Sequence, residues 1–223
     1  MSDNVFIEVY NRLFSEYGPQ GWWPVTPEGG ITPEYSGGPR DRKGIFEVAV
    51  GAILTQNTAW KNVSLAIEAL NRADLMNPEK ISRVNIKRLA SLIRSAGYYN
   101  QKARRLKEIA RFFIKNKFNA TRANLLAING VGPETADSIM LYAFNEPHFV
   151  VDAYTRRIFS RLGLVDGRAS YEEIKQLFEK NLPRDVYIYQ EYHALIVEHG
   201  KRFCKKNPDC KRCCLSDICG KKE

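Results

Sequence analysis

The chain has 223 residues, 44% of them hydrophobic, which is enough to bury a sizeable core in one domain or two small ones. Lysine and arginine number 34 against 25 acidic residues, and the net charge of +9 favours a polyanionic partner. No apolar run approaches the roughly 18 residues of a membrane span, and the N-terminal sequence lacks a signal-peptide pattern. We therefore expect a cytoplasmic, nucleoid-associated protein with no membrane partner.

The spacing of apolar residues predicts helices along most of the chain. The first is an amphipathic helix over 4–16, followed by an ordered loop over 18–40 that is rich in proline and glycine. The further helices are predicted over 41–54, 58–72, 86–96, 100–116, 121–128, 133–144, 152–162, 170–181 and 185–202. The segment 148–151 favours a strand, but it is too short and isolated to form a sheet. The pattern predicts an all-α protein.

A glycine turn separates two of these helices. Gly130 and Gly132 permit backbone conformations that are closed to other residues, and Pro133 suits the first turn of a helix, where its missing N–H is no loss. The N–H groups at the start of the second helix face outward, where an anion can bind. We predict a hairpin at Gly130, Val131 and Gly132 that holds a DNA phosphate; an ordinary helix pair in a core is the alternative.

Four cysteines near the C-terminal end follow the pattern C-x5-C-x2-C-x5-C: Cys204, Cys210, Cys213 and Cys219. A fifth, Cys214, adjoins one of them and is expected to be a bystander. An odd number of cysteines in a cytoplasmic chain argues against disulfides, and structural zinc usually needs two close pairs where this chain has one. Four thiolates in a compact loop suit a [4Fe–4S] cluster, with zinc or no metal as the alternatives.

These motifs together resemble the endonuclease III superfamily of DNA glycosylases, in which a helix–hairpin–helix precedes a catalytic aspartate. The matching segments within residues 40 to 220 are Gly130-Val131-Gly132 with Thr135-Ala136-Asp137, Val151-Asp152-Ala153-Tyr154, Leu54-Thr55-Gln56-Asn57-Thr58, Gly97-Tyr98-Tyr99-Asn100-Gln101-Lys102-Ala103, and His199-Gly200. The resemblance implies two helical lobes with a DNA-binding cleft between them. One is a six-helix barrel over 41–149 with the hairpin, and the other combines 1–40 and 150–223 with the iron–sulfur loop at 204–219.

The resemblance also implies roles for single residues. Asp152 matches the catalytic aspartate, which would stabilise positive charge on the sugar when the bond to a flipped-out base breaks. A helix N-cap is its other role, and the two are compatible. Gln56 is expected to fill the gap that the base leaves, while Lys102 and Arg104 are either DNA backbone contacts or solvated surface. The remaining expected DNA contacts are Gly130, Val131, Gly132 and Thr135.

Glu134 bears on the outcome of the reaction. Bifunctional members of the superfamily have a lysine at this position, and its amine attacks the sugar, forms a Schiff base and leads to strand cleavage. A glutamate cannot form that imine. The chain is therefore expected to be monofunctional, hydrolysing the base and leaving an abasic site, with weak or absent AP lyase activity.

The expected substrate follows from a resemblance to the 3-methyladenine DNA glycosylases within the superfamily. Trp22, Trp23 and Phe46, together with Glu134, match their base pocket, and a cationic alkylated purine stacks favourably between electron-rich rings. Simple packing of a glycine-rich loop is the alternative for the two tryptophans. We expect a monomer that binds double-stranded DNA with an alkylated base, carries a [4Fe–4S] cluster and uses no nucleotide cofactor.

Other functions stay open. A thymine or uracil mismatch glycosylase would also lack the lysine and would keep the four cysteines, which the 3-methyladenine branch lacks. A bifunctional endonuclease III-like glycosylase and AP lyase would need another lysine. A non-catalytic DNA-binding module would not need Asp152, so the presence of this residue argues for activity. His193 and His199 are expected to be structural.

Overall fold

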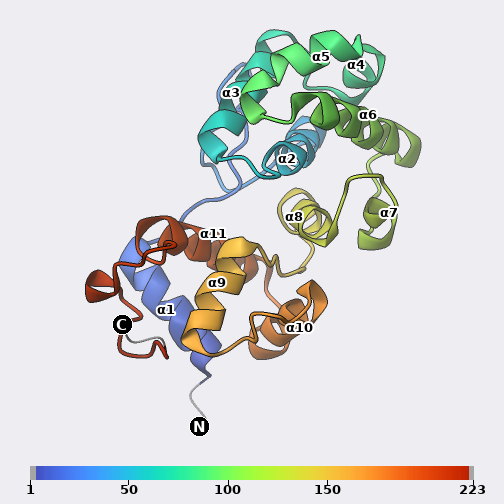
Figure 1. Ribbon diagram of the computed structural model, residues 1–223. Helices are drawn as coiled ribbons and strands as arrows, with labels where there is room; N and C mark the ends of the chain where they lie inside the picture. Colours follow the sequence, from blue (N-terminus) through green and yellow to red (C-terminus); the bar gives the residue numbers. More distant parts are fainter. Residues whose placement is uncertain (1–3, 221–223) are drawn as a thin grey trace. The chain divides into compact units, whose positions relative to one another are not determined.

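The protein is built from α-helices, as seen in the computed structural model, which describes residues 4–220 (Figure 1). None of these residues lies in a strand longer than an isolated β-bridge, so the predicted all-α class is confirmed. The chain divides into two compact units, one comprising Met1–Gln20 and Pro147–Glu223 and the other Gly21–Glu146. Within the described range, no helix is long and apolar enough to cross a bilayer.

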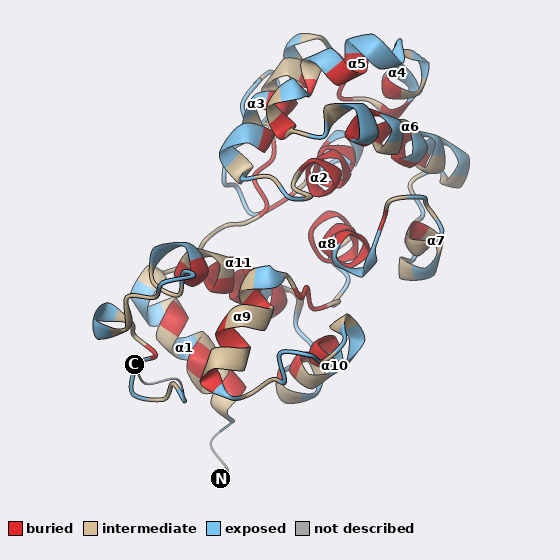
Figure 2. Cartoon of the chain, in the orientation of Figure 1, coloured by how far each residue is buried: buried red, intermediate tan, exposed pale blue. Residues whose placement is uncertain are grey.

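The unit Gly21–Glu146 is organised around α2, which is buried on almost all sides (Figure 2). Its helices are α2 (Arg42–Leu54), α3 (Trp60–Arg72), α4 (Pro78–Arg83), α5 (Ile86–Leu92), α6 (Tyr99–Asn116), α7 (Arg122–Leu126) and α8 (Pro133–Ala143). Every residue from 46 to 54 is buried, and all of them except Glu47 are apolar or glycine. The other helix with mostly buried residues is α8, which packs against α2.

Three elements differ from the sequence-based expectation. The short helix α4 was not predicted, although Asn77 caps it by accepting a hydrogen bond from the Lys80 N–H and Pro78 occupies its first turn. The predicted helix 86–96 divides into α5 and a 3-10 turn at Arg94–Ala96. Helix α7 is shorter than the predicted 121–128, because the chain turns toward the hairpin after Leu126.

The loop over 21–40 packs onto the same unit as α2. Trp23 is buried, and a Cβ added at Gly51 would lie 3.0 Å from the Trp23 ring, so the glycine makes room for the indole. Val25 and Glu34 form an antiparallel bridge that orders the loop. These residues therefore group with α2 to α8, whereas the sequence-based division placed all of 1–40 with the C-terminal helices.

A buried carboxyl group ties this loop to α2 and α3. The Oε1 atom of Glu47 accepts hydrogen bonds from the Thr26 N–H at 2.7 Å and the Thr26 hydroxyl at 2.8 Å, and Asn71 Nδ2 donates to that hydroxyl at 2.9 Å. Glu47 is fully buried. Burial raises the pKa of Glu47, and the hydrogen bonds from Thr26 offset part of that rise.

The unit that joins the two ends of the chain has an aromatic core. Its helices are α1 (Val5–Tyr17), α9 (Ala153–Leu162), α10 (Tyr171–Asn181) and α11 (Val186–Arg202), with a 3-10 turn at Cys210–Arg212. The Phe149 and Phe178 rings stack with centroids 4.2 Å apart, and Phe6 of α1 meets Phe178 edge-on at 5.1 Å. The Tyr192 hydroxyl donates to the Phe6 carbonyl at 2.7 Å. This core anchors α1 to helices more than 140 residues away.

Replacing Glu47 by glutamine is expected to flatten the dependence of stability on pH. Because folding raises this pKa above its ordinary value of 4.5, the associated stability is present below that pH and is lost as the pH rises through the folded-state pKa. Glu47→Gln keeps the acceptor for Thr26 and does not titrate. Urea unfolding should therefore show the variant gaining stability relative to wild type between about pH 5 and pH 8.

Glu28→Gln, at an exposed position of the same loop, is the matched control and should follow wild type at both pH values. A constant difference in the free energy of unfolding between wild type and Glu47→Gln at the two pH values would contradict the assignment.

Candidate active site

The predicted helix, tight turn and helix are present at residues 122–143. Gly130 has a φ of 87°, which favours glycine, and the Val131 N–H donates to the Ile128 carbonyl at 3.0 Å to close the turn. Gly132 is the N-cap of α8 and makes no side-chain capping hydrogen bond, while Pro133 occupies the first turn. The start of α8 therefore has the features of an anion-binding helix terminus.

A buried ion pair holds α7 against α8. Arg122 Nε lies 2.7 Å from Asp137 Oδ1, and the Asp137 side chain is fully buried. The capping box of Thr121 and Asn124 starts α7 in the same region. Asp137 is thus part of the scaffold that carries the hairpin.

Gln56 and Thr135 meet at the hairpin. Gln56 Nε2 donates to the Gly130 carbonyl at 3.1 Å and to Thr135 Oγ1 at 3.0 Å, and Arg105 Nη1 donates to Gln56 Oε1. The expected DNA-contacting residues Gln56, Gly130 and Thr135 are thereby brought together. Sequence reasoning missed Arg105, which is one of several basic residues on α6 and has no distinguishing local pattern.

Lys102 lies beneath the loop that carries Gln56. Its side chain is 1% exposed, and Nζ donates to the Leu54 carbonyl at 2.8 Å, Thr58 Oγ1 at 2.8 Å and the Ala96 carbonyl at 2.7 Å. Burial, with the charge of Arg105 as a second cause, lowers the pKa of Lys102 to about 8. The ammonium form thus prevails at neutral pH, with one N–H for each acceptor. Neither expectation for Lys102, DNA contact or solvated surface, was correct.

The two tryptophans of the loop join an aromatic cluster that is larger than predicted. Trp22 lies with its ring centroid 4.8 Å from that of Trp60 and 5.8 Å from that of Tyr35. Trp23 packs against Tyr142 at 5.3 Å and is buried. Tyr35 is 59% exposed, and Trp22 and Trp60 are partly exposed, so these three rings offer surface to a ligand.

The other two predicted pocket residues lie in different surroundings. Phe46 is fully buried in α2 and meets Phe113 edge-on at 5.6 Å, which places it in the core between α2 and α6. Glu134 is exposed in the first turn of α8, where a negative charge is favourable. Sequence reasoning missed Trp60, although it directly follows the Thr58-Ala59 pair after the Gln56 motif.

Asp152 is the N-cap of α9, as its position before the helix suggested. Its Oδ1 accepts hydrogen bonds from the Thr155 N–H at 2.7 Å and the Thr155 hydroxyl at 2.9 Å, and its Oδ2 lies 3.7 Å from His193 Nε2. Burial raises the pKa of Asp152, but the contacts with His193 and Thr155 outweigh burial and leave the pKa below its ordinary value. The carboxylate is therefore an anion at neutral pH.

His193 was expected to be structural, and the structure places it beside the acidic group. It lies on α11 and is 7% exposed. The separation of 3.7 Å from Asp152 is longer than a hydrogen bond and within the range of an electrostatic contact. Only the packing of α11 against α9 brings these residues together, because 41 positions separate them in the chain.

The four predicted ligand cysteines line one cavity of about 310 Å³. Arg161 Nη1 lies 3.2 Å from Cys204 Sγ, and His199 Nε2 lies 3.4 Å from Cys213 Sγ. Cys214 does not line the cavity, and burial raises its pKa to about 11, which suits an inert thiol. Among residues 4–220, no three His, Cys, Asp or Glu side chains are close enough together to hold a single metal ion.

The four cysteines that line this cavity are a suitable set of ligands for an iron–sulfur cluster. Four sulfur atoms face one space that is far larger than a single ion, and four thiolates are the usual ligands of a [4Fe–4S] cluster. The Arg161 guanidinium places a positive charge next to the Cys204 sulfur.

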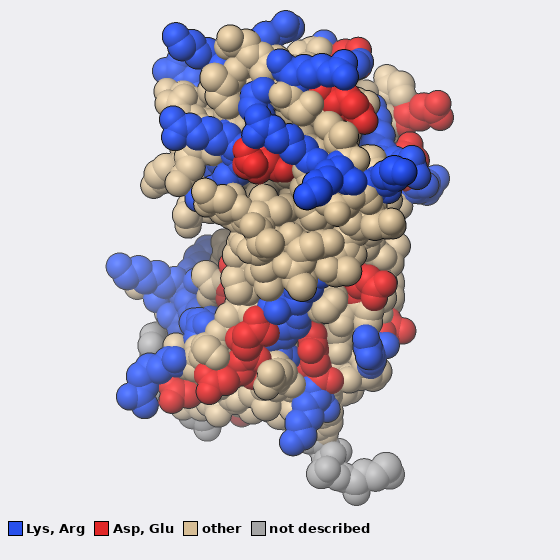
Figure 3. All heavy atoms as spheres, turned by 90° about the vertical axis from the view of Figure 1, so that its right-hand side faces the viewer, with Lys and Arg blue, Asp and Glu red and all other residues tan. Residues whose placement is uncertain are grey.

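Basic residues dominate part of the surface of the unit Gly21–Glu146. Residues 78–122, which span α4 to the start of α7, contain thirteen Lys or Arg and two acidic residues. Lys and Arg side chains predominate on the upper part of the face shown in Figure 3. Such an excess raises the local concentration of a polyanion and is typical of nucleic-acid-binding surfaces.

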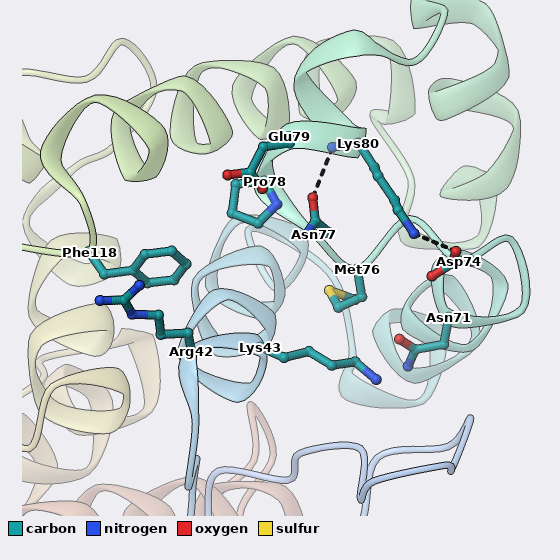
Figure 4. A pocket seen from close by; sticks show the side chains of 10 residues that line it. All are labelled: Arg42, Lys43, Asn71, Asp74, Met76, Asn77, Pro78, Glu79, Lys80 and Phe118. Carbon is teal, nitrogen blue, oxygen red and sulfur yellow. Dashed lines mark hydrogen bonds and ion pairs between the residues drawn. The ribbon is translucent and has the colours of Figure 1, made fainter.

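A second cavity of about 430 Å³ lies in the same unit, away from the predicted site residues (Figure 4). Arg42 lies over the Phe118 ring at 5.4 Å, and Lys80 pairs with Asp74 across the rim. Both positive side chains (Arg42, Lys43 and Lys80) and negative ones (Asp74 and Glu79) line this cavity, so its charge does not favour a phosphate.

The structure thus has the elements of a helical DNA-repair protein: a hairpin suited to phosphate and an ionised, capped aspartate. Residues 50–184 match the family described as HhH-GPD superfamily base excision DNA repair protein. The chain is 47% identical to a Methanocaldococcus jannaschii protein that carries the provisional name DNA repair glycosylase, over 98% of this chain and 99% of that relative. The chain belongs to the HhH-GPD superfamily and is a DNA glycosylase of base excision repair.

Two solved structures share the fold. The H. pylori 3-methyladenine DNA glycosylase bound to 1,N6-ethenoadenine is 28% identical, with a TM-score of 0.72 over 88% of this chain and 97% of that one. A trapped covalent intermediate of endonuclease III and DNA is 21% identical, with a TM-score of 0.80 over 99% of this chain and 97% of that one. The second likeness establishes the fold. The family match over residues 50–184 confirms the predicted membership of the endonuclease III superfamily.

Removing the Lys102 amine is expected to destabilise the protein strongly. Lys102→Met removes three hydrogen bonds from a charged donor, each worth about 1.5–3 kcal/mol. The Leu54 carbonyl loses this buried donor, while the Ala96 carbonyl keeps the Thr58 hydroxyl as a donor at 2.6 Å. We expect the free energy of unfolding to fall by about 3 kcal/mol or more, measured by urea denaturation. Lys115→Met, at an exposed position of the same helix, should cost less than about 0.5 kcal/mol. Equal losses in the two variants would show that Lys102 is not a structural tie.

Proposed function

We propose that the protein is a monofunctional DNA glycosylase that hydrolyses alkylated purines, of the 3-methyladenine kind, from double-stranded DNA. The observation that carries the proposal is the Asp152 carboxylate, an anion with one oxygen engaged in a helix cap and the other directed to His193. The likeness of the chain to the H. pylori 3-methyladenine DNA glycosylase supports the choice of substrate.

The chemistry follows from the properties of an N-glycosidic bond. The damaged base must first leave the duplex stack, since the bond is not accessible within it. As the bond breaks, the base takes the bonding electron pair and positive charge develops on the sugar. Asp152 stabilises this charge and accepts a proton from the water that attacks the sugar carbon, so the products are the free base and an abasic site.

The hydrogen bonds of Asp152 assign different tasks to its two oxygens. Oδ1 is occupied by the N–H and the hydroxyl of Thr155, which fix the orientation of the carboxyl plane. Oδ2 makes the longer contact with His193 and is the oxygen available to the sugar and the water. His193 then helps to keep the carboxylate ionised in a mostly buried position.

Aromatic surface accounts for the selection of an alkylated base. Trp22, Trp60 and Tyr35 present rings that are not fully buried, and an electron-poor purine gains about 1–3 kcal/mol by stacking on such a ring. An alkylated purine is also an activated leaving group, so the reaction needs less acid catalysis. On this proposal Trp60 takes the place in base recognition that sequence reasoning gave to Phe46.

Glu134 supports a reaction that stops at base removal. It stands where the resemblance places the lysine of bifunctional enzymes, and a carboxylate cannot form a Schiff base. Lys102 has a lowered pKa, which is a property of amine nucleophiles, but its amine is buried and donates to three acceptors. It is therefore a poor substitute for the missing lysine.

Cys204, Cys210, Cys213 and Cys219 would hold a [4Fe–4S] cluster, which when bound acts as a cross-link of the loop. Basic residues flank these cysteines: Lys201, Arg202, Lys205, Lys206, Lys211 and Arg212. A loop fixed in one conformation presents these charges to DNA phosphates at a low entropic cost, and each contact adds to the salt dependence of binding.

Asp152→Asn is expected to abolish base release while leaving DNA binding intact. The amide retains the cap acceptor but loses the negative charge, so single-turnover release of 3-methyladenine from a duplex should fall by about 10²–10⁴-fold. Asp166→Asn, which removes an exposed carboxylate beyond α9, should release the base at the wild-type rate.

The same assay on G·T, G·U and oxidised-base duplexes tests the substrate. Release from mismatches but not from alkylated DNA would replace the proposal by a mismatch glycosylase. Efficient borohydride trapping of a protein–DNA adduct would show that the enzyme is bifunctional.

The purified protein is expected to contain about four iron atoms and to absorb near 400 nm. Cys204→Ser should lose most of this iron, whereas Cys214→Ser should retain it, because Cys214 does not line the cavity. Stoichiometric zinc, or a full complement of iron in Cys204→Ser, would refute the cluster assignment.

A further inference from the structure

The Gln56 side chain is fully engaged by its own protein. Its Nε2 donates to the Gly130 carbonyl at 3.1 Å and to Thr135 Oγ1 at 3.0 Å, while its Oε1 accepts from Arg105 Nη1. These partners lie 49 to 79 positions away in the chain, so the side chain joins α6, the hairpin and the first turn of α8. A side chain that filled a gap in DNA would have to give up these bonds.

Arg105 lies across the hairpin itself. A Cβ added at Gly130 would lie 2.4 Å from Arg105 Nε and 2.8 Å from Cδ, so the side chain covers the glycine at contact distance. No carboxylate among the described residues forms an ion pair with Arg105. Its positive charge is therefore not neutralised, and it is placed beside the uncapped start of α8.

We propose that Gln56 and Arg105 form a brace that holds the glycine hairpin in its phosphate-binding conformation. The brace holds the Gly130 carbonyl by a hydrogen bond from Gln56 and adds a full positive charge next to the α8 terminus. The ligand is a phosphodiester group of any duplex, damaged or not. Gln56 is thus a positioning residue of the hairpin, an inference that rests on the DNA binding of the proposed function but not on its substrate.

The brace and the gap-filling role of Gln56 make different demands on one amide group. The amide cannot bond to Gly130 and Thr135 and at the same time to the orphaned partner of a flipped base. A gap-filling residue affects base flipping, and hence the rate of base release at saturating enzyme. A brace affects the affinity for every duplex, whether or not it contains a damaged base.

The test measures the affinity of the full-length protein for an undamaged 20-base-pair duplex by fluorescence anisotropy. Gln56→Ala and Arg105→Ala should each weaken binding by about tenfold, the equivalent of one lost hydrogen bond. The double variant should be no weaker than the weaker single variant, because both changes break the same brace. Gln56→Glu, which keeps the acceptor for Arg105 but cannot donate to Gly130, should bind as weakly as Gln56→Ala.

Arg104→Ala is the matched control, since it removes the same charge from the exposed neighbouring position. It should weaken binding by less than about threefold. Thermal unfolding verifies that each variant is folded.

Undamaged-duplex affinity that is unchanged in Gln56→Ala would overturn the proposal, as would additive losses in the double variant. A lower saturating rate of base release with normal affinity would instead assign Gln56 to gap filling. The anisotropy measurement uses undamaged DNA and requires no base release. Its result is therefore independent of whether the protein releases alkylated bases.

Discussion

The buried ammonium group of Lys102 is the contact on which the region around Gln56 and the glycine hairpin depends. It joins the last turn of α2, the loop that follows and the 3-10 turn before α6 through three hydrogen bonds. Without it, the Leu54 carbonyl at the end of the most buried helix would lose its donor. The position of Gln56, and through Gln56 that of the hairpin, follows from this anchoring.

Two helix starts are used in opposite ways. Helix α8 begins at Gly132, which has no side chain to cap it, so its first turn is suited to an external anion. Helix α9 begins at Asp152, whose carboxylate fills the same position with an internal anion. The start of α8 is suited to holding a phosphate. The start of α9 holds its own carboxylate, which His193 and Thr155 keep ionised.

Local signals predicted most of the helices, but they failed where packing decided the outcome. Asn77 and Pro78 are sufficient to start α4, yet the helix is too short to show a clear apolar period. Phe46 and Trp60 are both aromatic residues near the Gln56 motif. Their burial separates them, because Phe46 faces the centre of the unit from α2 while Trp60 starts a helix at its surface.

The sequence by itself determined the helical class, the glycine hairpin, the capping position of Asp152 and the cysteine spacing. These depend on backbone freedom, helix caps and periodicity, which act over a few residues. Only the tertiary structure decided that His193 faces Asp152, that Lys102 is an internal tie and that Gln56 and Arg105 meet over Gly130. Such contacts join residues tens of positions apart, and they form only after helices have packed and excluded water from the polar groups between them.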